Sequence, residues 1–482
     1  MTVRALGAAV LAASWLMAPA VLRAAEATAE ADQAKTQKER EEYYELYKVL
    51  ADTLDQVERN YVEDVDRREL FEAAIEGILE KLDPYSNYIS PEELSRFKTS
   101  VEQEFGGIGI QVGPDRDGGL RVTSPLYGTP AYRAGVMAGD RIVEIAGEST
   151  DGMSLDEAVR RMKGEAGTTV SFKVIHPNGK QAEYTIEREV IHVQSVLGAT
   201  RKTDDTWNFM FDDEKKIGYL RLTAFSRDTA RELRDAVKEL QGAGMKGLVL
   251  DLRFNPGGLL NAAIEVSDMF VAEGKIVSTR GKNTAERTWD AEKPGTIDGF
   301  PIAVLVNHFS ASASEIVAAC LQDHNVAVVI GERTWGKGSV QNVVDLEDGK
   351  SALKLTTASY WRPSGKNIHR SPKDDESKEW GVKPNEGYEV KFSNDETFAL
   401  MEHWRDRDII RAHEEAKPEA PQAAAEEQPT EPAADADADA AKTEGSEEAK
   451  PAETSAEVAK PFEDRQLQKA IDYLSTELAK VD

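Results

Sequence analysis

Three serines, each separated from the next by one alanine, begin an apolar segment, SASASEIVAACLQ, at residues 310–322. A hydroxyl at a helix N-terminus meets free backbone N–H groups and the positive end of the helix dipole, which stabilise the negative charge that develops during acyl transfer. The same segment also has a purely structural explanation. Ser312 and Glu315 have the spacing of a capping box, in which the serine only accepts a backbone hydrogen bond, and from this segment alone capping is the favoured interpretation.

A single lysine, Lys337 in GERTWGKGSVQ, changes this balance. A lysine acts as a general base toward a serine only when its amine is neutral, and burial favours that state. Lowering the pKa from about 10.4 to about 7 or 8 corresponds to roughly 3 to 5 kcal/mol. Gly336 and Gly338 permit close packing, and Trp335 and Val340 could form an apolar wall around the amine.

Gln341 follows Lys337 by four residues, a spacing that places both side chains on one face of a strand. The side-chain carbonyl of Gln341 could orient the amine. A lone lysine is most often a surface charge, so the lysine indicates chemistry only together with the serine.

The elements that must position these residues lie between residues 217 and 390, where apolar strands alternate with helical segments. KGLVLDLRFNPGG is a strand that enters a turn, and PIAVLV and NVAVVIG are two further strands. Continuous apolar strands joined by helices predict an α/β fold with a mostly parallel sheet and flanking helices. Sites collect at the carboxyl ends of such strands, where two candidate loops lie, at residues 253–258 and 307–312.

Residues 101–190 have a different pattern, with short strands, glycine-marked turns and one helix near Ser154 to Lys163. The run GGIGIQVG, joined to TPAYRAGVMAGDRIVEIAGE, resembles a PDZ domain. Such a domain adds an extended peptide to a sheet edge and holds its terminal carboxylate in a nest of backbone N–H groups. The resemblance implies a carboxylate-binding loop made of Gly107, Ile108, Gly109 and Ile110.

Residues 1–27 have the pattern of a secretory signal peptide, with Arg4, an apolar run and small residues suited to cleavage between Ala24 and Ala27. An uncleaved anchor is the alternative, because the run is near the lower length limit for a membrane span. We therefore expect export to the periplasm, with the protein soluble or associated with the inner membrane through its N-terminus. Residues 28–100 show helical periodicity and predict an N-terminal helical region with a solvated charged face.

The other end of the chain is first acidic and then apolar. Residues 413–460 are mostly Ala, Glu, Pro, Asp and Lys, and they predict a disordered acidic linker because they cannot bury enough apolar surface to fold. A C-terminal helix is expected in residues 461–482, and it must dock either on the catalytic body or on a second copy. Its apolar residues have helical spacing: Leu467, Ala470, Ile471, Leu474 and Leu478.

Composition narrows the function classes. The 482 residues and the formal net charge of -28 predict two to four domains and argue against a primary nucleic-acid binder. One cysteine excludes a disulfide framework and a multi-cysteine metal site, and we expect no cofactor and no metal.

GERTWGK matches the GxxxxGK phosphate loop, but Gly338 stands where a Ser or Thr should bind magnesium. Cys320 and His324 could suggest a thiol nucleophile, although Cys320 lies within an apolar helix stripe.

Taken together, the PDZ-like segment, DLRFNPGG, NHFSASASEIVAACLQD and GERTWGKGSVQ resemble the carboxyl-terminal processing, or tail-specific, serine proteases. The resemblance covers nearly the whole folded part of the chain, from LDPYSNYISPEE at residues 82–93 to GVKPN at residues 381–385. It implies a crotonase-like protease core over residues 191–412. Phe309, Asn385 and Tyr85 stand where Gly, Asp and His are expected in many relatives.

The resemblance also implies roles for particular residues. The serine of the SASEI run is the nucleophile in this family, and the lysine of the GKGxxQ run is the general base. Asp323 matches the family as well, without a defined role. Carried over by motif, the roles are nucleophile Ser312, in preference to Ser310 and Ser314, base Lys337, supporting residue Gln341, and oxyanion donors Ala313 and one of Gly257 or Gly258.

These features predict an exported, ATP-independent serine endopeptidase that binds the free C-terminus of a partly unfolded protein in its PDZ groove. The resemblance further implies that PDZ engagement gates the active site and that copies assemble into a homo-oligomer through terminal helices, and an adaptor protein is among the partners considered. Two other functions stay open. One is a non-catalytic PDZ scaffold that binds protein C-terminal tails, and the other is an esterase that uses the same serine and lysine.

Overall fold

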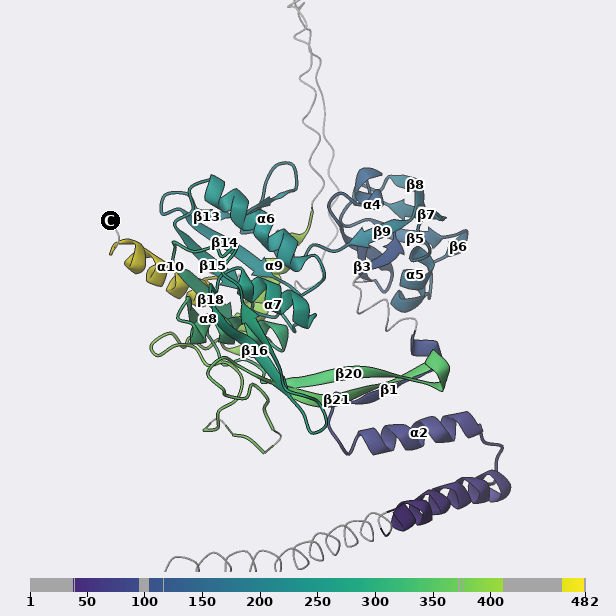
Figure 1. Cartoon of the computed structure of the whole chain (residues 1–482). Helices are drawn as coiled ribbons and strands as arrows, with labels where there is room; N and C mark the ends of the chain where they lie inside the picture. The colour runs from purple at the N-terminus through teal and green to yellow at the C-terminus, as the bar shows by residue number, and fades with distance from the viewer. Residues whose placement is uncertain are drawn as a thin grey trace, which may run out of the picture. The chain divides into compact units, whose positions relative to one another are not determined.

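The computed structural model describes residues 38, 40–94, 104–115, 117–371, 373–375, 377–410 and 462–480. They divide into two compact units, Met1–Pro91 with Val343–Leu355, and Glu92–Asn342 with Thr356–Asp482 (Figure 1). The expected signal peptide at 1–27 and acidic linker at 413–460 lie outside the described residues. Among the described residues, no helix combines the length and the apolar character needed to cross a membrane.

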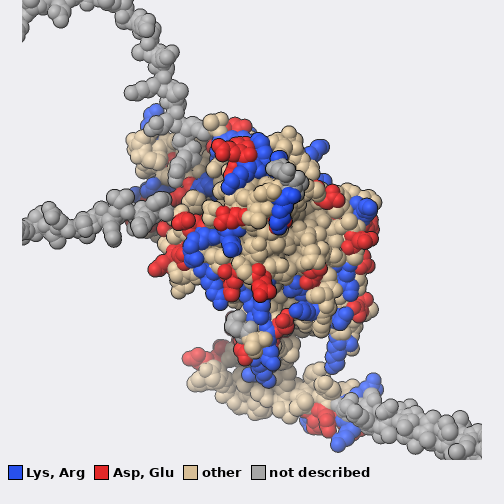
Figure 2. All heavy atoms as spheres, turned by 90° about the vertical axis from the view of Figure 1, so that its left-hand side faces the viewer, with Lys and Arg blue, Asp and Glu red and all other residues tan. Residues whose placement is uncertain are grey.

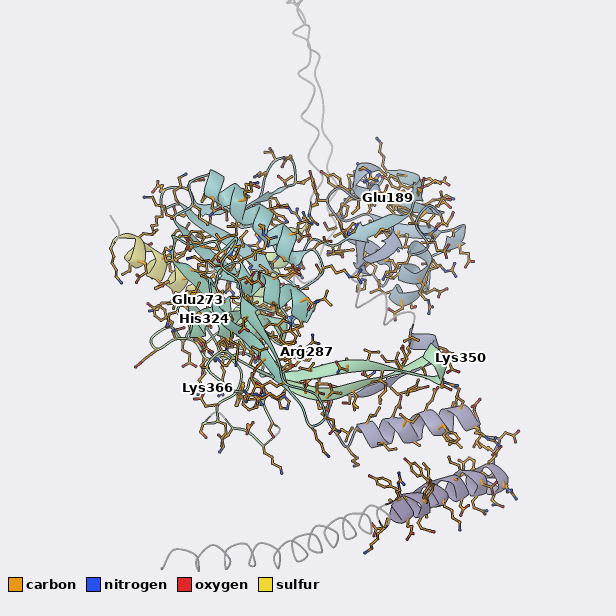
Figure 3. All side chains as sticks on the ribbon, viewed as in Figure 1. Glu189, Glu273, Arg287, His324, Lys350 and Lys366 are labelled. Atoms are coloured by element: carbon orange, nitrogen blue, oxygen red, sulfur yellow. The ribbon has the colours of Figure 1, made fainter. Side chains whose placement is uncertain are left out.

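The first unit contains a helix over residues 40–60 and α2 (Arg67–Leu79), in the region where the periodicity predicts helices. α2 begins at Asp66, whose side chain accepts hydrogen bonds from the N–H groups of Arg68 and Glu69. This unit also contains a short strand that the periodicity does not predict, β1 (Asn87–Ile89), which pairs antiparallel with part of β21 (Ser351–Trp361). Lys350 follows the 3-10 turn η1 (Glu347–Gly349) just before β21 (Figure 3).

The PDZ-like segment folds around its own core in the second unit. Its main sheet has the order β3-β4-β5-β7-β8 with antiparallel pairs, so β3 is an edge strand. The helix expected near Ser154 to Lys163 is α5, which packs against β3. The elements are β2 (Glu104–Gly107), β3 (Ile110–Pro114), β4 (Leu120–Pro125), α4 (Pro130–Arg133), β5 (Arg141–Ile145), β6 (Glu148–Ser149), α5 (Leu155–Met162), β7 (Thr169–Ile175), β8 (Gln181–Glu187) and β9 (Glu189–His192).

The part of the second unit between residues 217 and 331, where we expect the catalytic residues, is built on four parallel strands, which lie in the order β14-β15-β18-β19. Every residue of β14, β15 and β18 is buried, as continuous apolar strands require. Helices lie between them in the chain, as crossovers between parallel strands need. The bounds are β14 (Ile217–Leu222), α6 (Thr229–Gly242), β15 (Gly247–Asp251), α7 (Leu260–Asp268), β18 (Ile302–Val306), α8 (Ala313–Asp323) and β19 (Ala327–Gly331).

Shorter strands extend this sheet and form others. β10 (Val196–Leu197) and β13 (Met210–Asp212) both pair antiparallel with β14, and β11 (Thr200–Arg201) pairs with β12 (Trp207–Asn208). β16 (Gly274–Arg280) pairs antiparallel with β17 (Arg287–Ala291) and with the end of β21, which also pairs with β20 (Ser339–Leu346).

The fold is therefore mixed α/β, but the prediction of a mostly parallel sheet holds only for β14, β15, β18 and β19. The other sheets are mostly antiparallel, and two of the strands that pair with β14 are antiparallel to it. The physical reason is the length of the connections. Strands joined by tight turns can only run antiparallel, whereas the four central strands have helices between them.

The two faces of the central sheet have separate covers. Alternate residues such as Leu220, Leu250 and Val304 face the core that α6, α7 and α8 complete. The residues between them, such as Tyr219, Val249 and Leu305, pack against α10 (Arg465–Leu478). Figure 1 shows α10, in yellow, beside β15 and β18. The C-terminal helix thus docks on the catalytic body, which was one of the two options that the sequence left open.

One further helix, α9 (Asn394–Asp408), precedes α10 and begins with a complete capping box formed by Ser393 and Glu396. On the face of the molecule drawn in Figure 2, Lys and Arg side chains lie among Asp and Glu side chains.

We expect Leu474→Ala to lower the free energy of unfolding of the catalytic body by about 2 to 5 kcal/mol, the usual cost of a large-to-small change in a core. Leu474 is fully buried and lies 3.6 Å from where a side chain at Gly247 would begin, so the cavity cannot fill from that side. Urea unfolding measures the change. Thr476→Ala, an exposed position on the same helix, should shift the value by less than about 0.5 kcal/mol.

Candidate active site

Ser312 holds the strained position between the loop after β18 and the first turn of α8. Its backbone has φ 56 and ψ -112, and its side chain is half-buried. The caps Ser154 and Ser393 instead have φ -70 with extended ψ, the usual cap conformation. A non-glycine residue at positive φ costs about 1 to 3 kcal/mol and is found preferentially at functional sites. A serine on a strained turn into a helix is the arrangement that presents a nucleophile.

The two neighbouring serines have structural hydrogen bonds. The Ser310 hydroxyl donates to the Leu252 carbonyl oxygen (2.8 Å), and the Ser314 hydroxyl donates to the Asn255 carbonyl oxygen (2.9 Å). Both serines are completely buried. Since each hydroxyl proton is already given to a carbonyl of the neighbouring loop, Ser310 and Ser314 are poor nucleophile candidates, and Ser312 is favoured.

Glu315 connects the nucleophile loop to the lysine loop. Its carboxylate oxygen Oε2 accepts from the backbone N–H of Ser312 and from that of Lys337, at 2.8 Å each. Its other oxygen, Oε1, accepts from the Gly336 N–H (2.7 Å) and from the Thr334 hydroxyl (2.5 Å). The backbones of Ser312 and Lys337 therefore lie within two hydrogen-bond lengths of each other.

The Glu315 side chain is completely buried, and this burial raises its pKa to about 7, against the opposing effect of its four hydrogen bonds. The ionised form accepts from all four donors, whereas the O–H of a protonated carboxyl would face one of these donors without an acceptor. The sequence analysis recognised Glu315 only as a capping-box residue. Its bonds to residues 334–337 could not be found from local spacing.

Lys337 is half-buried and follows a tightly packed glycine. A Cβ atom at Gly336, which has φ +87, would lie 2.7 Å from the Arg370 Cβ, and one at Gly338 would lie 2.2 Å from the His369 backbone nitrogen. The expected close packing is therefore present. Trp335, by contrast, is 50% exposed, so it does not supply the dry wall considered for the amine.

Gln341 lies in β20, four residues after Lys337. Its side-chain amide nitrogen donates to the hydroxyls of Ser339 (2.8 Å) and Thr356 (3.1 Å). Both bonds use the nitrogen, so the carbonyl oxygen is the end that could accept a hydrogen bond from the lysine amine.

The oxyanion candidates lie against Ser312, the candidate nucleophile. A Cβ atom at Gly257 would lie 2.7 Å from the Ser312 Cβ and 3.0 Å from the Ala313 nitrogen, so glycine is required at this contact. Ala313 is the first residue of α8, where an N–H has no acceptor within the helix. The Gly257 N–H donates to the Asn255 side chain (2.9 Å), which makes Gly258 the better second donor.

Asn255, which the sequence analysis did not single out, joins these loops. Its backbone carbonyl accepts from the Ala311 N–H (3.0 Å) as well as from Ser314, and its side-chain nitrogen donates to the Leu222 carbonyl (2.9 Å). The residue is completely buried. Its only sequence signal is its place in the Asn-Pro-Gly-Gly turn.

The implied carboxylate loop, Gly107 to Ile110, joins β2 to β3 in the PDZ module. Ile108 is buried, and Gly109 has φ +79 with Thr129 so close that a Cβ would lie 2.3 Å from the Thr129 Cβ. The edge strand β3 begins at Ile110. An edge strand preceded by a glycine loop is the geometry that β-strand addition of a peptide needs.

Other candidates have structural partners. Asp323 ends α8, about 16 Å from its start at 1.5 Å per residue, and binds the Arg362 guanidinium at 2.6 and 2.9 Å. Burial raises the pKa of Cys320 to about 12, so it is no ready thiolate. The His324 ring lies 2.8 Å from the Lys275 carbonyl oxygen (Figure 3).

Among the departures from the family, Phe309 is partly exposed and Asn385 accepts from the Val329 N–H (2.9 Å).

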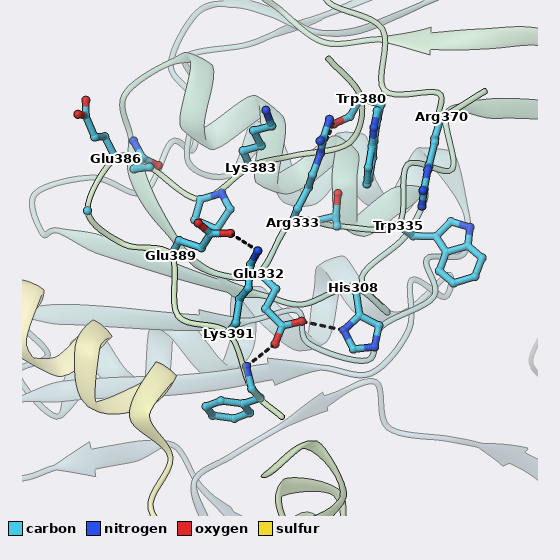
Figure 4. Close-up of a pocket in the computed structure, with 15 residues that line it drawn as sticks. His308, Glu332, Arg333, Trp335, Arg370, Trp380, Lys383, Glu386, Glu389 and Lys391 are labelled. Atoms are coloured by element: carbon cyan, nitrogen blue, oxygen red, sulfur yellow. Dashed lines mark hydrogen bonds and ion pairs between the residues drawn. The ribbon is translucent and has the colours of Figure 1, made fainter. Parts of the chain in front are cut away.

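A pocket of about 720 Å³ lies beside these loops (Figure 4). His308 and Trp335 line it, and Glu332 accepts from the His308 ring and from the Phe392 N–H within it. Trp380 stacks with Arg333 at 3.4 Å in the same wall. Ser312, Lys337 and Gln341 are not among its lining residues, so we do not place the chemistry inside it.

Comparison with known proteins identifies the families and relatives that this chain resembles. Family models match the chain as Peptidase family S41 (residues 216–386), PDZ domain (94–175) and Activating protease CtpB N-terminal domain (5–93). The chain is 42% identical over 331 residues to a carboxy-terminal-processing protease of Bartonella bacilliformis, covering 67% of this chain and 73% of that protein. It is 36% identical over 332 residues to the carboxy-terminal processing protease CtpA of Bacillus subtilis, covering 68% and 66%. A solved photosystem II D1 C-terminal processing protease is 30% identical, with 71% of this chain and 92% of that one covered and a TM-score of 0.41.

We expect Glu315→Gln to lower kcat for peptide cleavage by at least about tenfold, because the new amide group turns donors toward N–H groups that need an acceptor. The folded state of the wild type also binds more protons than the unfolded state between the usual pKa of 4.5 and about 7. Its free energy of unfolding should therefore fall by about 3 kcal/mol, to order of magnitude, as the pH rises through that window.

Steady-state kinetics and urea unfolding at several pH values measure both effects in the Glu315 variant, which should lose this pH dependence. The control is Glu396→Gln, which changes the same position of the α9 capping box and an exposed pair with Arg465. It should keep kcat, because exposed pairs of this kind contribute little. A Glu315→Gln protein as active as the wild type would contradict the role of the carboxylate.

Proposed function

This chain belongs to the carboxyl-terminal processing serine proteases of peptidase family S41, with a PDZ domain, and we propose that it cleaves polypeptides with a Ser312–Lys337 pair. One observation carries the proposal: a single carboxylate oxygen of Glu315 binds the backbone N–H groups of both residues. The proposed nucleophile and base, 25 positions apart in the sequence, are thus held on adjoining loops at the ends of adjacent strands.

In this mechanism the Ser312 hydroxyl attacks the carbonyl carbon of the scissile peptide bond, and the neutral Lys337 amine takes the hydroxyl proton. The N–H groups of Ala313 and Gly258 bind the oxyanion that forms. When the intermediate collapses, the Lys337 ammonium gives its proton to the departing amine. Water, activated by the amine, then hydrolyses the acyl-enzyme and restores the serine.

The strained turn at Ser312 supports this assignment. The positive φ takes the Ser312 backbone out of the usual cap conformation, while Gly257 allows the oxyanion loop to approach its Cβ. Gln341 takes the supporting role, because its side-chain nitrogen is bonded to Ser339 and Thr356 and its carbonyl oxygen is left as the acceptor for the amine. Removing one oxyanion donor typically costs about 3 to 4 kcal/mol, so the position of the Gly257–Gly258 turn is as important as the pair itself.

We further propose that the PDZ module captures the free C-terminus of the substrate. The support is the edge strand β3, which follows the glycine loop of residues 107–110 and has α5 packed against it. Cleavage would then occur upstream of the captured end and would make the enzyme an endopeptidase. The alternative of a non-catalytic scaffold has against it the joint presence of Ser312, Lys337 and Gln341.

Export, a crotonase-like core and ATP-independent action remain proposals that rest on the leader-like residues 1–27, on the central sheet and on the family. PDZ gating, an adaptor and a homo-oligomer are likewise proposals that rest on the family. Because α10 is docked on its own sheet, the exposed apolar residues of the N-terminal helix, Tyr44 and Tyr47 among them, are the better basis for assembly. A monomeric mass at working concentration would remove that proposal.

We expect Ser312→Ala and Lys337→Ala each to lower kcat by about a thousandfold or more, because each removes a partner of the covalent step. The assay is cleavage of a flexible polypeptide with an apolar free C-terminus, with circular dichroism to confirm the fold. Ser377→Ala, at an exposed position, is the control and should keep most activity. Cleavage by Ser312→Ala at the wild-type rate would show that another residue is the nucleophile, and intact substrate with the wild type would support the scaffold.

We expect Gly109→Ala to weaken binding of a peptide with a free C-terminus by at least about tenfold, because the new Cβ would force the carboxylate loop away from Thr129. Calorimetry with free-acid and amidated forms of one peptide measures the effect, and the wild type should prefer the free acid. Gly118→Ala is the matched control, since Gly118 has φ +81 but open space around it. Equal affinity of the wild type for both peptides would contradict carboxylate capture.

A further inference from the structure

A completely buried arginine lies at the root of the oxyanion loop. Arg253 follows β15, and all five N–H donors of its guanidinium have acceptors. Asp251 accepts from Nε (3.0 Å) and from one N–H of Nη2 (2.6 Å), and Asp464 accepts from Nη2 (2.8 Å) and Nη1 (2.9 Å). The side-chain oxygen of Gln466 accepts the last bond from Nη1 (3.1 Å). Three of the five bonds therefore come from residues more than 200 positions later in the chain.

Asp464 and Gln466 stand at the start of α10 and are themselves fixed. Asp464 is the N-cap residue, and its carboxylate also accepts from the Leu467 N–H (3.0 Å). The Gln466 side chain is buried and donates to the Val390 carbonyl (2.8 Å). Since Ile471 and Leu474 anchor the same helix on the sheet, Arg253 is held by a firmly docked element.

Only four residues separate Arg253 from Gly258, and long-range contacts hold the turn between them. Phe254 has φ 58, its N–H donates to the Asn307 side chain (3.0 Å), and its ring lies 5.1 Å from that of Phe309. Asn255 then binds the start of α8, as described above. Because these contacts fix the turn, a displacement of Arg253 would also displace the backbone of Gly257 and Gly258.

We propose that Asp464 and Gln466 are positioning residues, which hold Arg253 and thereby keep the Gly258 N–H where the oxyanion forms. This inference rests on the proposed function, which gives Gly258 its role. A guanidinium left with unsatisfied donors in a dry site must find other acceptors, and its movement carries the turn with it. Peptidase activity therefore depends on the docking of α10, although α10 does not touch the substrate.

The test compares two full-length variants, Asp464→Asn and Asp472→Asn. Asparagine caps a helix as well as aspartate does, so Asp464→Asn keeps the cap and removes charge and an acceptor from Arg253. Asp472 lies exposed on the same helix, and its carboxylate accepts from Gln468 (2.8 Å). It therefore controls for the loss of a carboxylate on α10.

We expect Asp464→Asn to lower kcat by at least about tenfold while KM changes by less than about threefold, since loss of one oxyanion donor costs about 100- to 1000-fold. The Kd of a peptide boronic acid, whose tetrahedral adduct with a serine mimics the oxyanion, should rise by a similar factor. Asp472→Asn should match the wild type in all three quantities. Simple instability would reduce the active fraction but would leave this Kd unchanged, and that result would overturn the proposal.

Amide hydrogen exchange at residues 254–258 supplies a readout that needs no activity, and it should be faster in Asp464→Asn while exchange in β7 of the PDZ module stays the same. If Asp464→Asn does not fold, Gln466→Met removes one bond from Arg253 at similar volume and should show smaller changes in the same direction. The inference would be overturned if these variants had the same kcat, the same Kd for the boronic acid and the same amide exchange rates as the wild type. A wild type that neither cleaves peptides nor binds the boronic acid would instead refute the proposed function, and the exchange result would then decide whether α10 holds the loop.

Discussion

The carboxylate of Glu315 is the interaction on which the candidate site depends, because it ties two loops that end neighbouring parallel strands. Four donors converge on its two oxygens, and three of them are backbone N–H groups, so the bond fixes the path of the chain and not only a side chain. A buried charge is costly, and the raised pKa shows that the cost has not been fully offset. This buried carboxylate lies between the loops that carry Ser312 and Lys337.

The residues with local signals could be predicted from the sequence. Ser312 and Lys337 stand in distinctive runs, and the continuous apolar strands indicated the four parallel strands that carry them. Contacts between distant segments had no such signal. The second role of Glu315, the bonds of Asn255 and the partners of Arg253 depend on which loops meet at the strand ends, and spacing within one segment cannot report that. The prediction of a mostly parallel sheet was wrong for a related reason: it rested on the apolar strands, whereas the many short strands between tight turns form the antiparallel majority.

Charge in the catalytic body is used in two different ways. At the surface, acidic and basic side chains are mixed and exposed, and such pairs contribute little. In the interior, Arg253, Asp251 and Glu315 are completely enclosed and have partners at nearly every polar atom. Interior ions of this kind add little net stability compared with apolar residues, but they tolerate only one arrangement of their donors and acceptors. In this molecule they fix the positions of backbone segments near Ser312. The Arg253–Asp251 pair lies next to the turn at residues 254–258, and Glu315 binds the loop of Ser312.

The docking of α10 has a consequence for the way in which the molecule is made. The strands whose outer face it covers are complete by residue 331, yet their cover is not synthesised until residues 465–478. A nascent chain that has left the ribosome only as far as β19 therefore presents an apolar sheet face to its surroundings and lacks the acceptors for a guanidinium that has already been buried on one side. Translation must therefore continue past residue 466 before Arg253 has all its acceptors, and past residue 474 before this sheet face is covered.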